Sequence, residues 1–461
     1  MSFIRSISGV RGVVGDTLTP DVIVRYAAAF AEYSKRGKIV IGRDGRITGK
    51  IIGNLVSSTL LSMGCDVVAL GIAPTPTIAI AQRQLRAAGG ISITASHNPM
   101  QWNGLKFIGS DGMFLSAEQN QQLWTIADKT IPRYVSWEKF GKHSTDETMI
   151  DKHISAVLQL PYIKADQIKQ KKFKVVVDCI NAAGGVIIPL LLKKLGCNVI
   201  EMNCDVSGIF SRTPEPLPEN LDALCERVVK EKADLGVAVD PDVDRLALIT
   251  EKGEPFGEEY TITSVVKFIL AKRPLTTSRS PLTVVVNLST TRAVDDIAKQ
   301  YDATVVRTPV GEINVAQKMK ECGALIGGEG SGGVILPAIH YGRDAVTAIG
   351  LLLQQLAEFS GTLSELKTSL PQYSMIKSKL EINKKDPDRL LQDIVRRHAQ
   401  NGKANMEDGL RLDYDDSWIH LRKSNTEPII RIIAEAPAME RAQDLVNRFK
   451  NELQKSSHDA V

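Results

Sequence analysis

Short runs of β-branched residues recur along this chain, and each is followed by a polar or glycine-rich stretch and then by a helical pattern. The clearest runs are residues 38–44, 174–178, 234–239 and 282–287. Strands that are apolar throughout are buried on both faces, as in mostly parallel sheets covered by helices. Ligands of such sheets bind beyond the carboxyl ends of the strands. The polar stretches after these runs are therefore the first places to look for functional residues.

The helical patterns between the runs carry boundary signals of their own. In the first pattern, Thr19 can cap the helix, Pro20 suits its first turn, and Gly37 can end it. A second helix is predicted over residues 48–62. Helices that alternate with strands are the crossover connections that parallel strands need.

The pattern changes near the C-terminus. Residues 409–413 and 417–422 alternate between apolar and polar side chains, as half-exposed antiparallel strands do, and residues 428–434 form a further strand pattern. A single apolar helix face follows, made by Ala442, Leu445, Val446, Phe449 and Leu453. The fold class is therefore α/β, with three similar α/β domains of mixed, mostly parallel sheets and a C-terminal α+β domain. The predicted boundaries give domains 1–150, 151–251, 252–369 and 370–461.

Composition argues against several classes of protein, including nucleic-acid-binding, membrane-spanning and disulfide-rich proteins. The 461 residues include 57 Lys and Arg against 53 Asp and Glu, and the net charge of +4 is too small to indicate a nucleic-acid partner. No apolar stretch is long enough to span a membrane, and the first residues lack the apolar run of a signal peptide. The six cysteines include no C-x-x-C pair, which favours buried structural thiols over a disulfide framework or a zinc site. We expect a cytoplasmic protein.

The first polar loop with a chemical signal covers residues 94–99 and contains Ser96 and His97. Small and turn-forming residues here predict an exposed turn that presents the Ser96 hydroxyl. A simple turn explains this short motif at least as well. A hydrolase pair of Ser96 and His97 is not favoured. The two residues are adjacent in sequence, which rarely lets their side chains face each other, and there is no G-x-S-x-G elbow.

The second loop covers residues 240–245 and places Asp240, Asp242 and Asp244 at alternate positions after a buried strand. Carboxylates spaced in this way can converge on one hard cation. A solvated acidic turn is less favoured, because three like charges so close together repel one another. The loop lacks the glycine and glutamate spacing of a calcium loop. The sequence therefore indicates magnesium, with phosphate oxygen completing its coordination.

Two further loops offer groups for a ligand. Residues 327–333 contain five glycines, which allow close backbone approach, together with Glu329 and Ser331, which can bond ligand hydroxyls. No Lys-Ser/Thr follows, so this is not a P-loop, and a plain flexible turn is an equal alternative. Residues 422–428, with Arg431, combine arginines, hydroxyls and backbone amides that suit a phosphate dianion. A polar hairpin is the alternative there.

The four loops, one per predicted domain and in this order, resemble those of the α-D-phosphohexomutase family. Residues 8–12 are similar to the family's N-terminal G-x-R-G motif, and residues 103–106 follow the serine loop as expected. The resemblance covers the whole chain and implies four domains around a central cleft. It implies an intramolecular phosphotransferase that binds a small-molecule hexose phosphate, as a monomer or a homodimer.

The resemblance also implies residue roles. Ser96 would be carried as a phosphoserine that donates its phosphoryl group to a hexose phosphate and produces a bound glucose- or glucosamine-1,6-bisphosphate. One Mg²⁺ per chain would be held by Ser96, Asp240, Asp242 and Asp244. The remaining catalytic residues would be Arg11, Lys106, His97 and Arg245. Substrate would be bound by Glu329, Ser331, Arg422, Ser424, Asn425, Thr426 and Arg431.

Two positions depart from the family pattern. Many bacterial members end the sugar loop in Ser-Gly-His, whereas this chain has Gly333, so the proton role proposed for that histidine is vacant or taken by another group. Lys423 replaces a common proline. The glycine-rich form of the sugar loop favours a phosphoglucosamine mutase, and a phosphomannomutase/phosphoglucomutase is the close alternative. A non-catalytic sugar-phosphate-binding paralogue and a metal-dependent phosphatase are alternatives from other classes.

Overall fold

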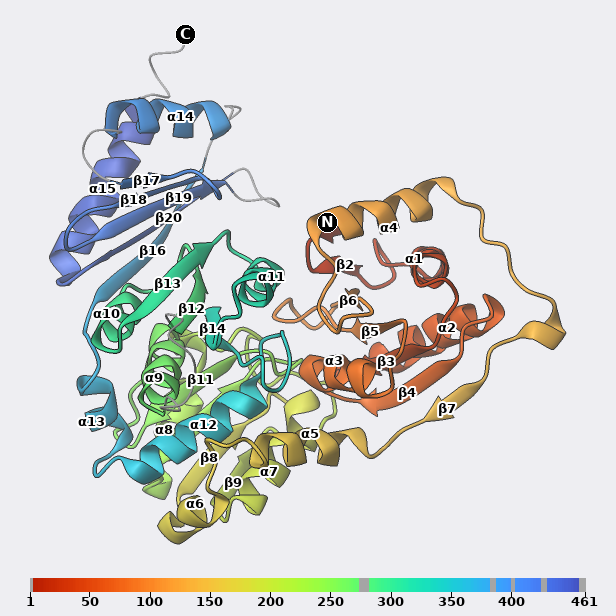
Figure 1. Ribbon diagram of the computed structural model, residues 1–461, viewed down its shortest axis with the longest axis horizontal. Helices are drawn as coiled ribbons and strands as arrows, with labels where there is room; N and C mark the ends of the chain where they lie inside the picture. Colours follow the sequence, from red (N-terminus) through yellow and green to blue (C-terminus); the bar gives the residue numbers. More distant parts are fainter. Residues whose placement is uncertain (1–2, 273–281, 382–386, 399–402, 424–428, 456–461) are drawn as a thin grey trace.

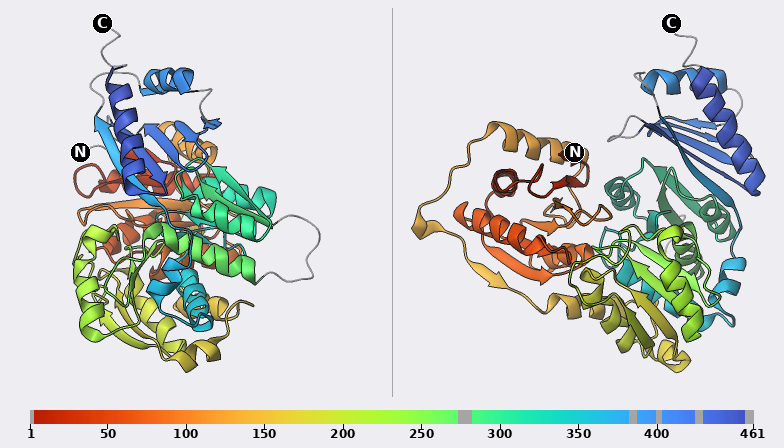
Figure 2. Two further views of the ribbon diagram at one scale, coloured as in Figure 1. Left: turned by 90° about the vertical axis from the view of Figure 1, so that its left-hand side faces the viewer. Right: turned by 180° about the vertical axis from the view of Figure 1, so that it is seen from behind.

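The computed structural model describes residues 3–272, 282–381, 387–398, 403–423 and 429–455 and contains four β-sheets, each formed by a separate stretch of the chain (Figure 1). Three sheets mix parallel and antiparallel strands, and the fourth is antiparallel. This arrangement confirms the predicted fold class. In Figures 1 and 2 the first unit (red to orange) and the C-terminal unit (blue) lie on either side of the two middle units.

The first unit has a seven-stranded sheet in the order β1-β2-β6-β5-β3-β4-β7. Its buried centre is β3, which runs parallel to both β4 and β5, while β6 is antiparallel to β5. The strands are β1 (Ile4–Ser6), β2 (Gly9–Val13), β3 (Ile39–Arg43), β4 (Val67–Ile72), β5 (Gly89–Ile93), β6 (Trp102–Ile108) and β7 (His143–Thr145). The helices are α1 (Pro20–Tyr33), α2 (Gly49–Ser62), α3 (Thr75–Gln84), α4 (Ala117–Lys129) and the 3₁₀ turn η1 (Trp137–Lys139).

Helix α1 begins where the sequence predicts but ends earlier. Thr19 is the N-cap residue, although its hydroxyl bonds Asp21 and not a backbone amide. The helix ends at Tyr33 and not near Gly37, because the backbone of Lys35 and Arg36 turns into the left-handed region at φ 52° and 56°. The Arg36 amide then donates to the carbonyl of Ala31 at 2.8 Å. The prediction for the end of this helix was therefore wrong.

The second and third units repeat one topology. Three parallel strands are followed by one antiparallel edge strand, in the orders β11-β10-β8-β9 and β13-β12-β14-β15. The strands are β8 (Lys174–Asp178), β9 (Asn198–Met202), β10 (Leu235–Val239), β11 (Leu246–Thr250), β12 (Leu282–Asn287), β13 (Ala303–Thr308), β14 (Ile326–Glu329) and β15 (Gly333–Ile335).

Helices cover these two sheets and join them. One continuous hydrophobic core contains buried residues of both units, such as Val177, Val284 and Ile349. The helices are α5 (Met149–Leu158), α6 (Ala165–Lys171), η2 (Ala183–Val186), α7 (Ile188–Lys194), η3 (Pro218–Asn220), α8 (Asp222–Glu231), α9 (Glu258–Ala271), α10 (Ala293–Gln300), α11 (Glu312–Cys322), α12 (Ala345–Glu358) and α13 (Leu363–Thr368). The shared core holds the second and third units in one fixed relation.

The C-terminal unit is an antiparallel sheet with helices packed on one face. Its order is β16-β20-β19-β18-β17. The elements are β16 (Ser374–Glu381), α14 (Pro387–His398), β17 (Lys403–Asn405), β18 (Leu410–Asp413), β19 (Trp418–Lys423), β20 (Ile429–Ala436) and α15 (Met439–Lys455). The five residues predicted to form the apolar face of the last helix are all buried in this unit. The prediction of a separate α+β unit is confirmed.

The same hairpin recurs in the first three units, and it places the predicted loops. The serine loop joins β5 to β6, the aspartate loop joins β10 to β11, and the glycine-rich loop joins β14 to β15. In each unit the loop leaves the carboxyl end of a strand that is parallel to its inner neighbour and returns as an antiparallel strand. The three loops are therefore structurally equivalent.

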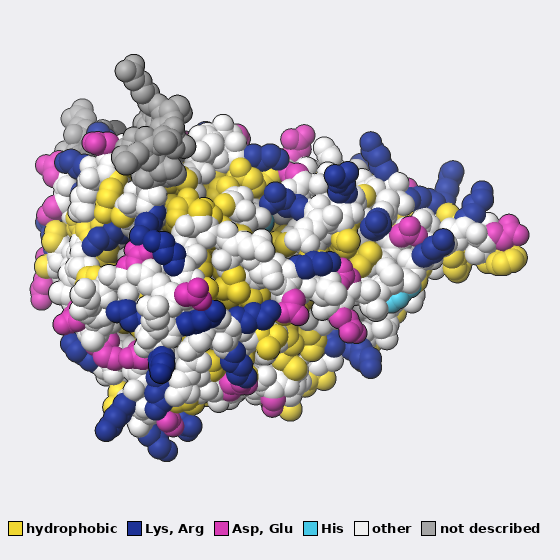
Figure 3. Space-filling view, turned by 60° about the horizontal axis from the view of Figure 1, so that its bottom comes forward, with side chains coloured by type: hydrophobic (Ala, Val, Ile, Leu, Met, Phe, Trp, Pro, Cys, Tyr) yellow, Lys and Arg dark blue, Asp and Glu magenta, His cyan; other side chains and the backbone are white. Residues whose placement is uncertain are grey.

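The surface and the cysteines give two further outcomes. Cys65 and Cys179 are buried, but Cys322 is exposed, so the prediction of buried thiols holds only in part. Within the described ranges no helix combines the length and apolar character needed to cross a bilayer. On the face shown in Figure 3, basic and acidic side chains are interspersed and form no large area of one sign.

Candidate functional site

The serine loop of the first unit meets the aspartate loop of the second. The Ser96 hydroxyl donates to Oδ2 of Asp240 at 3.2 Å, and Ser96 has a positive φ of 48°, a conformation that is uncommon for a residue other than glycine. Only 5% of Ser96 is exposed. The predicted exposed turn is therefore wrong: the turn is present, but the second unit covers it.

Arg46 fixes the shape of this turn, and the sequence analysis did not identify it. The side chain is fully buried and donates to Asp44. Its two terminal nitrogens donate to four carbonyl oxygens of the serine loop, those of Ser96, Asn98 and Pro99 at 2.7 Å and of Trp102 at 3.0 Å. The guanidinium also lies 4.8 Å from the ring centre of Phe210 in the second unit. Its position directly after the buried strand β3 was the available signal.

The three aspartates lie together and are all buried, with one oxygen of each within 4.8 Å of the others. Protein groups hold one side of each carboxylate. Asp240 Oδ1 accepts from two backbone amides, Asp242 Oδ2 accepts from Thr75 and Lys106, and Asp244 Oδ2 accepts from Arg343. Oδ1 of Asp242 and Oδ1 of Asp244 are buried and accept no hydrogen bond, and Nε of Arg245 lies 3.8 Å from the second of these oxygens. Buried carboxylate oxygens without donors fit a hard cation such as Mg²⁺.

The charges of this cluster are strongly coupled. Burial and the neighbouring carboxylates raise the pKa of Asp240 well above its usual range. Burial acts in the same direction on Asp244, but Arg343, Lys106 and Arg245 outweigh it and lower the pKa of that group. Burial would lower the pKa of Lys106, but Asp242 and Asp244 outweigh it and raise the pKa to about 12. The cations therefore favour the ionised form of Asp244, whereas Asp240 is the carboxyl group of the cluster that burial and its neighbours make easiest to protonate.

Two arginines and a histidine border the cluster. Arg11 donates to the side-chain oxygen of Asn98 at 2.9 Å, and Arg245 donates to Glu215 at 2.5 Å. Burial and the charge of Arg245 lower the pKa of Arg11. Burial and both arginines lower the pKa of His97 to about 2, so its ring is neutral at ordinary pH. Two cations held so close together favour an anion between them, such as a phosphate.

The glycine-rich loop joins the same site through Glu329, which is buried at the end of β14. Its Oε1 accepts from the Asn287 amide at 2.8 Å and from the Gly311 backbone at 3.0 Å, and its Oε2 accepts from Arg343 at 2.7 Å. Ser331, at the tip of the loop, is half-buried. Because Arg343 also bonds Asp244, the glycine-rich loop and the aspartate loop share one partner.

The predicted phosphate loop lies on the C-terminal unit. Arg422 and Arg431 are directly opposite on β19 and β20, and Lys379 of β16 is opposite Arg431. Like charges on neighbouring strands are unfavourable unless an anion joins them. Asp408 accepts from Arg422 at 2.7 Å and also from the Val310 amide of the third unit at 2.9 Å. Ser424, Asn425 and Thr426 lie outside the described residues.

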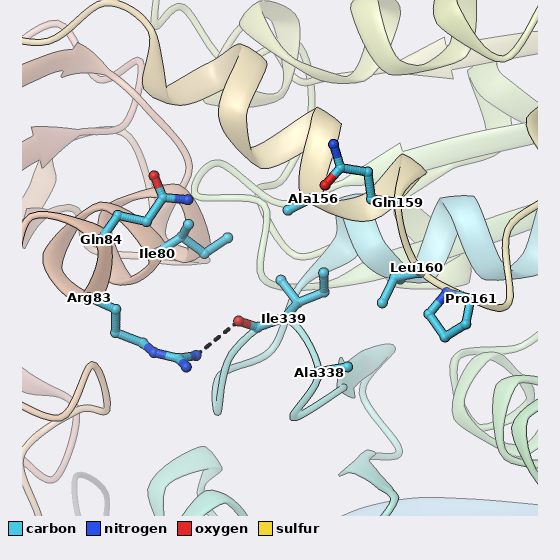
Figure 4. Close-up of a pocket in the computed structure, with 9 residues that line it drawn as sticks. All are labelled: Ile80, Arg83, Gln84, Ala156, Gln159, Leu160, Pro161, Ala338 and Ile339. Atoms are coloured by element: carbon cyan, nitrogen blue, oxygen red, sulfur yellow. Dashed lines mark hydrogen bonds between the residues drawn. The ribbon is translucent and has the colours of Figure 1, made fainter.

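The predicted residues thus fall into two groups, a cluster around Ser96 and the pair of Arg422 and Arg431 on the C-terminal unit. The cluster contains the serine, the aspartates, Lys106 and Arg245. Arg11 and His97 lie beside it, and Glu329 is joined to it through Arg343. Within the parts of the chain that are described, no hydrogen bond or ion pair connects Arg422 or Arg431 to this cluster. A cavity of about 540 Å³ between α3, α5 and residues 338–339 contains none of the predicted site residues (Figure 4).

Comparisons with known proteins bear on this arrangement. Sequence models for the phosphoglucomutase/phosphomannomutase family match the chain in order: alpha/beta/alpha domains I, II and III at residues 4–133, 151–253 and 263–373, and the C-terminal domain at residues 375–452. The chain belongs to this family.

Individual members of the family are similar over nearly the whole chain. A probable phosphoglucosamine mutase of Methanopyrus kandleri is 35% identical over 96% of both chains. A phosphoglucomutase/phosphomannomutase of Thermococcus kodakarensis is 36% identical over 95% of both. Among solved structures, a phosphoglucomutase/phosphomannomutase family protein of Burkholderia thailandensis aligns over 98% of both chains, with a TM-score of 0.84 and 26% identity.

Proposed function

We propose that this protein is a phosphohexomutase that interconverts hexose 6-phosphate and hexose 1-phosphate, with glucosamine phosphate as its substrate. The observation that carries the proposal is the Ser96 hydroxyl, which bonds Asp240 within a buried cluster in which two carboxylate oxygens accept no hydrogen bond. Arg11 and Arg245 lie beside this cluster and can bind a phosphoryl group. A non-catalytic paralogue would not need this combination of nucleophile, cation ligands and anion-binding arginines.

The phosphoryl transfer can be written with these residues. Starting from phosphorylated Ser96, the bond between phosphorus and Oγ breaks while a sugar hydroxyl oxygen bonds to phosphorus and loses its proton, and the departing Oγ takes up one proton, so that Ser96 leaves as a hydroxyl and no net proton is released. The product is a bound hexose 1,6-bisphosphate, and its other phosphate returns to Oγ in the second half of the cycle. Ser96, Asp240, Asp242 and Asp244 would hold a magnesium ion, which would supply charge neutralisation. Arg11, Arg245 and Lys106 orient the moving group, and neutral His97 adds no charge to it.

The remaining predicted residues bind the rest of the substrate. Glu329 and Ser331 bond sugar hydroxyls, and Arg422 and Arg431 hold the phosphate that is not reacting. We include Lys379 with these two arginines because it is the next cation along the same face of the sheet. The C-terminal unit must move toward the first unit for both ends of one sugar to be bound, and this closure keeps water away from the phosphoryl group.

The choice of hexose rests on two observations. The glycine-rich form of the sugar loop and a 35% identical relative named phosphoglucosamine mutase support glucosamine phosphate. A 36% identical relative named phosphoglucomutase/phosphomannomutase supports the alternative. A 1,6-bisphosphate activator, one Mg²⁺ per chain, a cytoplasmic location and a monomeric or homodimeric state remain predictions.

Turnover and intact mass test the proposal together. Wild-type protein is assayed with glucosamine-, glucose- and mannose-6-phosphate and is expected to act on at least one, with glucosamine-6-phosphate fastest. A fraction of the protein should carry one phosphate, which Ser96→Ala removes along with turnover. Ser62→Ala, on the outer helix α2, is the matched control. Full turnover by Ser96→Ala would exclude the phosphoserine mechanism.

A further inference from the structure

Arg343 occupies a central position that neither the loop motifs nor their spacing revealed. It lies between β15 and α12, and only 9% of it is exposed. Its Nη1 bonds Oε2 of Glu329 at 2.7 Å and its Nη2 bonds Oδ2 of Asp244 at 2.5 Å. A third carboxylate holds it in place, because Glu312 accepts from the Arg343 backbone amide at 2.8 Å and lies 3.2 Å from Nε.

The side chain of Arg343 fills the space over Gly333. A Cβ atom added at Gly333 would lie 2.2 Å from Cδ of Arg343, so any side chain there would displace the arginine. No left-handed backbone conformation requires glycine at this position. Glycine is therefore needed at the end of the sugar loop to admit Arg343. This is the position at which many bacterial members of the family have a histidine.

The hydrogen bonds of Glu329 show what this contact does. A carboxylate offers about four lone-pair positions, two on each oxygen. Asn287 and Gly311 use both positions on Oε1, and Arg343 uses one on Oε2. One position remains for a ligand hydroxyl, and Arg343 decides where it points. The same guanidinium holds Oδ2 of Asp244, while Oδ1 of that residue accepts no hydrogen bond and lies 3.8 Å from Nε of Arg245.

We propose that Arg343 is a positioning residue that occupies the place of the missing loop histidine and aligns Glu329 and Asp244 with each other. Through this one planar group, the sugar that Glu329 binds is held in register with the carboxylate cluster of the second unit. The inference rests on the proposed phosphohexomutase function. Arg343 is thereby a determinant of sugar binding that lies outside the four loops.

The first test measures binding without turnover. In a Ser96→Ala background, each of the three hexose 6-phosphates is titrated by calorimetry. Arg343→Lys keeps the charge but replaces the two terminal nitrogens by a single one, which cannot reproduce the planar alignment of Glu329 with Asp244, and we expect about tenfold weaker binding. Glu329→Gln should weaken binding by a similar factor. If Arg343 acts through Glu329, the two losses are not additive, and the double variant binds about as weakly as either single variant.

The second test displaces Arg343 without removing any charge. Gly333→Ala puts a methyl group into the space of Cδ and should weaken sugar-phosphate binding as Arg343→Lys does. In an Arg343→Ala background the added methyl group has room, so Gly333→Ala should then have no further effect. Arg83→Ala is the control, because Arg83 bonds the Ile339 carbonyl of the same loop at 2.9 Å but contacts neither carboxylate (Figure 4). It should leave binding unchanged.

The outcomes separate this inference from the proposed function. The role of Arg343 would be overturned if both Arg343→Lys and Gly333→Ala bound the sugar phosphate as well as wild type. It would also be overturned if the binding losses of Arg343→Lys and Glu329→Gln were fully additive. Neither outcome would affect the turnover of the wild-type protein. Absence of turnover with every hexose phosphate would instead overturn the proposed function. Thermal unfolding shows whether each variant is folded. If Arg343→Ala does not fold, the role of Arg343 is decided by sugar-phosphate binding to Arg343→Lys and Gly333→Ala, each measured alone and combined with Glu329→Gln.

Discussion

Arg46 and Asp242 illustrate how single buried side chains set up the site. The guanidinium of Arg46 donates to four carbonyls in and next to the serine loop, of which the Ser96 carbonyl is buried. One oxygen of Asp242 accepts hydrogen bonds from Thr75 and Lys106, and the other accepts none. In both cases one residue type is required: a planar group with five donors in the first, an ionised carboxylate in the second.

Arg46→Lys should destabilise the serine loop. Lysine reaches fewer of the carbonyls, so the free energy of unfolding is expected to fall by about 3 kcal/mol. Phosphorylation of Ser96 and turnover should fall with it, because the positive φ of Ser96 loses its support. Urea unfolding and intact mass measure the two effects. Arg36→Lys, whose partner Glu32 lies on the surface, is the control. Unchanged stability and phosphorylation would show that Arg46 is dispensable.

Asp242→Asn should impair metal binding while it keeps the shape of the side chain. Removal of one charge from the cluster is expected to weaken Mg²⁺ binding and lower turnover by about two orders of magnitude or more. Calorimetric titration with Mg²⁺ and turnover assays check both. Asp111→Asn, at an exposed carboxylate, serves as control. Wild-type turnover in excess chelator, with metal analysis showing no retained ion, would contradict a metal role.

At the scale of elements, a buried polar junction joins helices of three units. The Thr77 hydroxyl on α3 lies 2.9 Å from Nδ1 of His153 on α5, and Nε2 of that histidine lies 3.0 Å from Asp344. Asp344 also caps α12 by accepting from the Val346 amide. Burial would raise the pKa of Asp344, but His153 and its hydrogen bonds outweigh it and lower the pKa. One carboxylate thus fixes a helix end and the contact between units.

Asp344→Asn should retain the helix cap, because asparagine is also a good N-cap residue, but lose the negative charge of the carboxylate that His153 contacts. The expected loss in the free energy of unfolding is about 3 kcal/mol at neutral pH. A carboxyl group with a lowered pKa stabilises the fold fully above its unfolded pKa of about 3.9, and this contribution is lost as the pH falls through the lower, folded value. The difference between the two proteins should therefore shrink below about pH 4. Denaturant unfolding across pH checks this, and a constant difference would contradict it.

At the scale of the whole molecule, the C-terminal unit is attached through the third. Asp408 bonds both Arg422 and the Val310 amide, and His420 lies 2.9 Å from the Ser289 hydroxyl. Figure 1 shows this unit above the third and away from the second. The domain boundaries at 150, 251 and 370 stay predictions, as do the roles of the site residues.

Arg422→Ala tests whether the C-terminal unit holds a phosphate. A charge-assisted contact contributes roughly 1.5–3 kcal/mol, so KM for the sugar phosphate should rise by about tenfold or more. We also expect kcat to fall, because the same contact positions the sugar. Lys423→Ala changes the next residue, whose partner is Asp388, and should have little effect. An unchanged KM in Arg422→Ala would leave the fourth loop as a polar hairpin only.

Local pattern determined much of this protein. The apolar runs became central strands, the alternating segments became the antiparallel sheet, and the three aspartates at alternate positions converged, because strand burial and loop spacing depend on residues close in sequence. Tertiary structure alone decided which loops meet, that Ser96 is covered by Asp240, and that Arg46 and Arg343 bind carbonyls and carboxylates distant in sequence. Such contacts carry no local periodicity. The contacts of Arg46 arise when β3 and the serine loop come together within the first sheet, and those of Ser96 and Arg343 arise only when the equivalent hairpins of three sheets are packed together, because each side chain takes its partners from whatever the packing brings within reach.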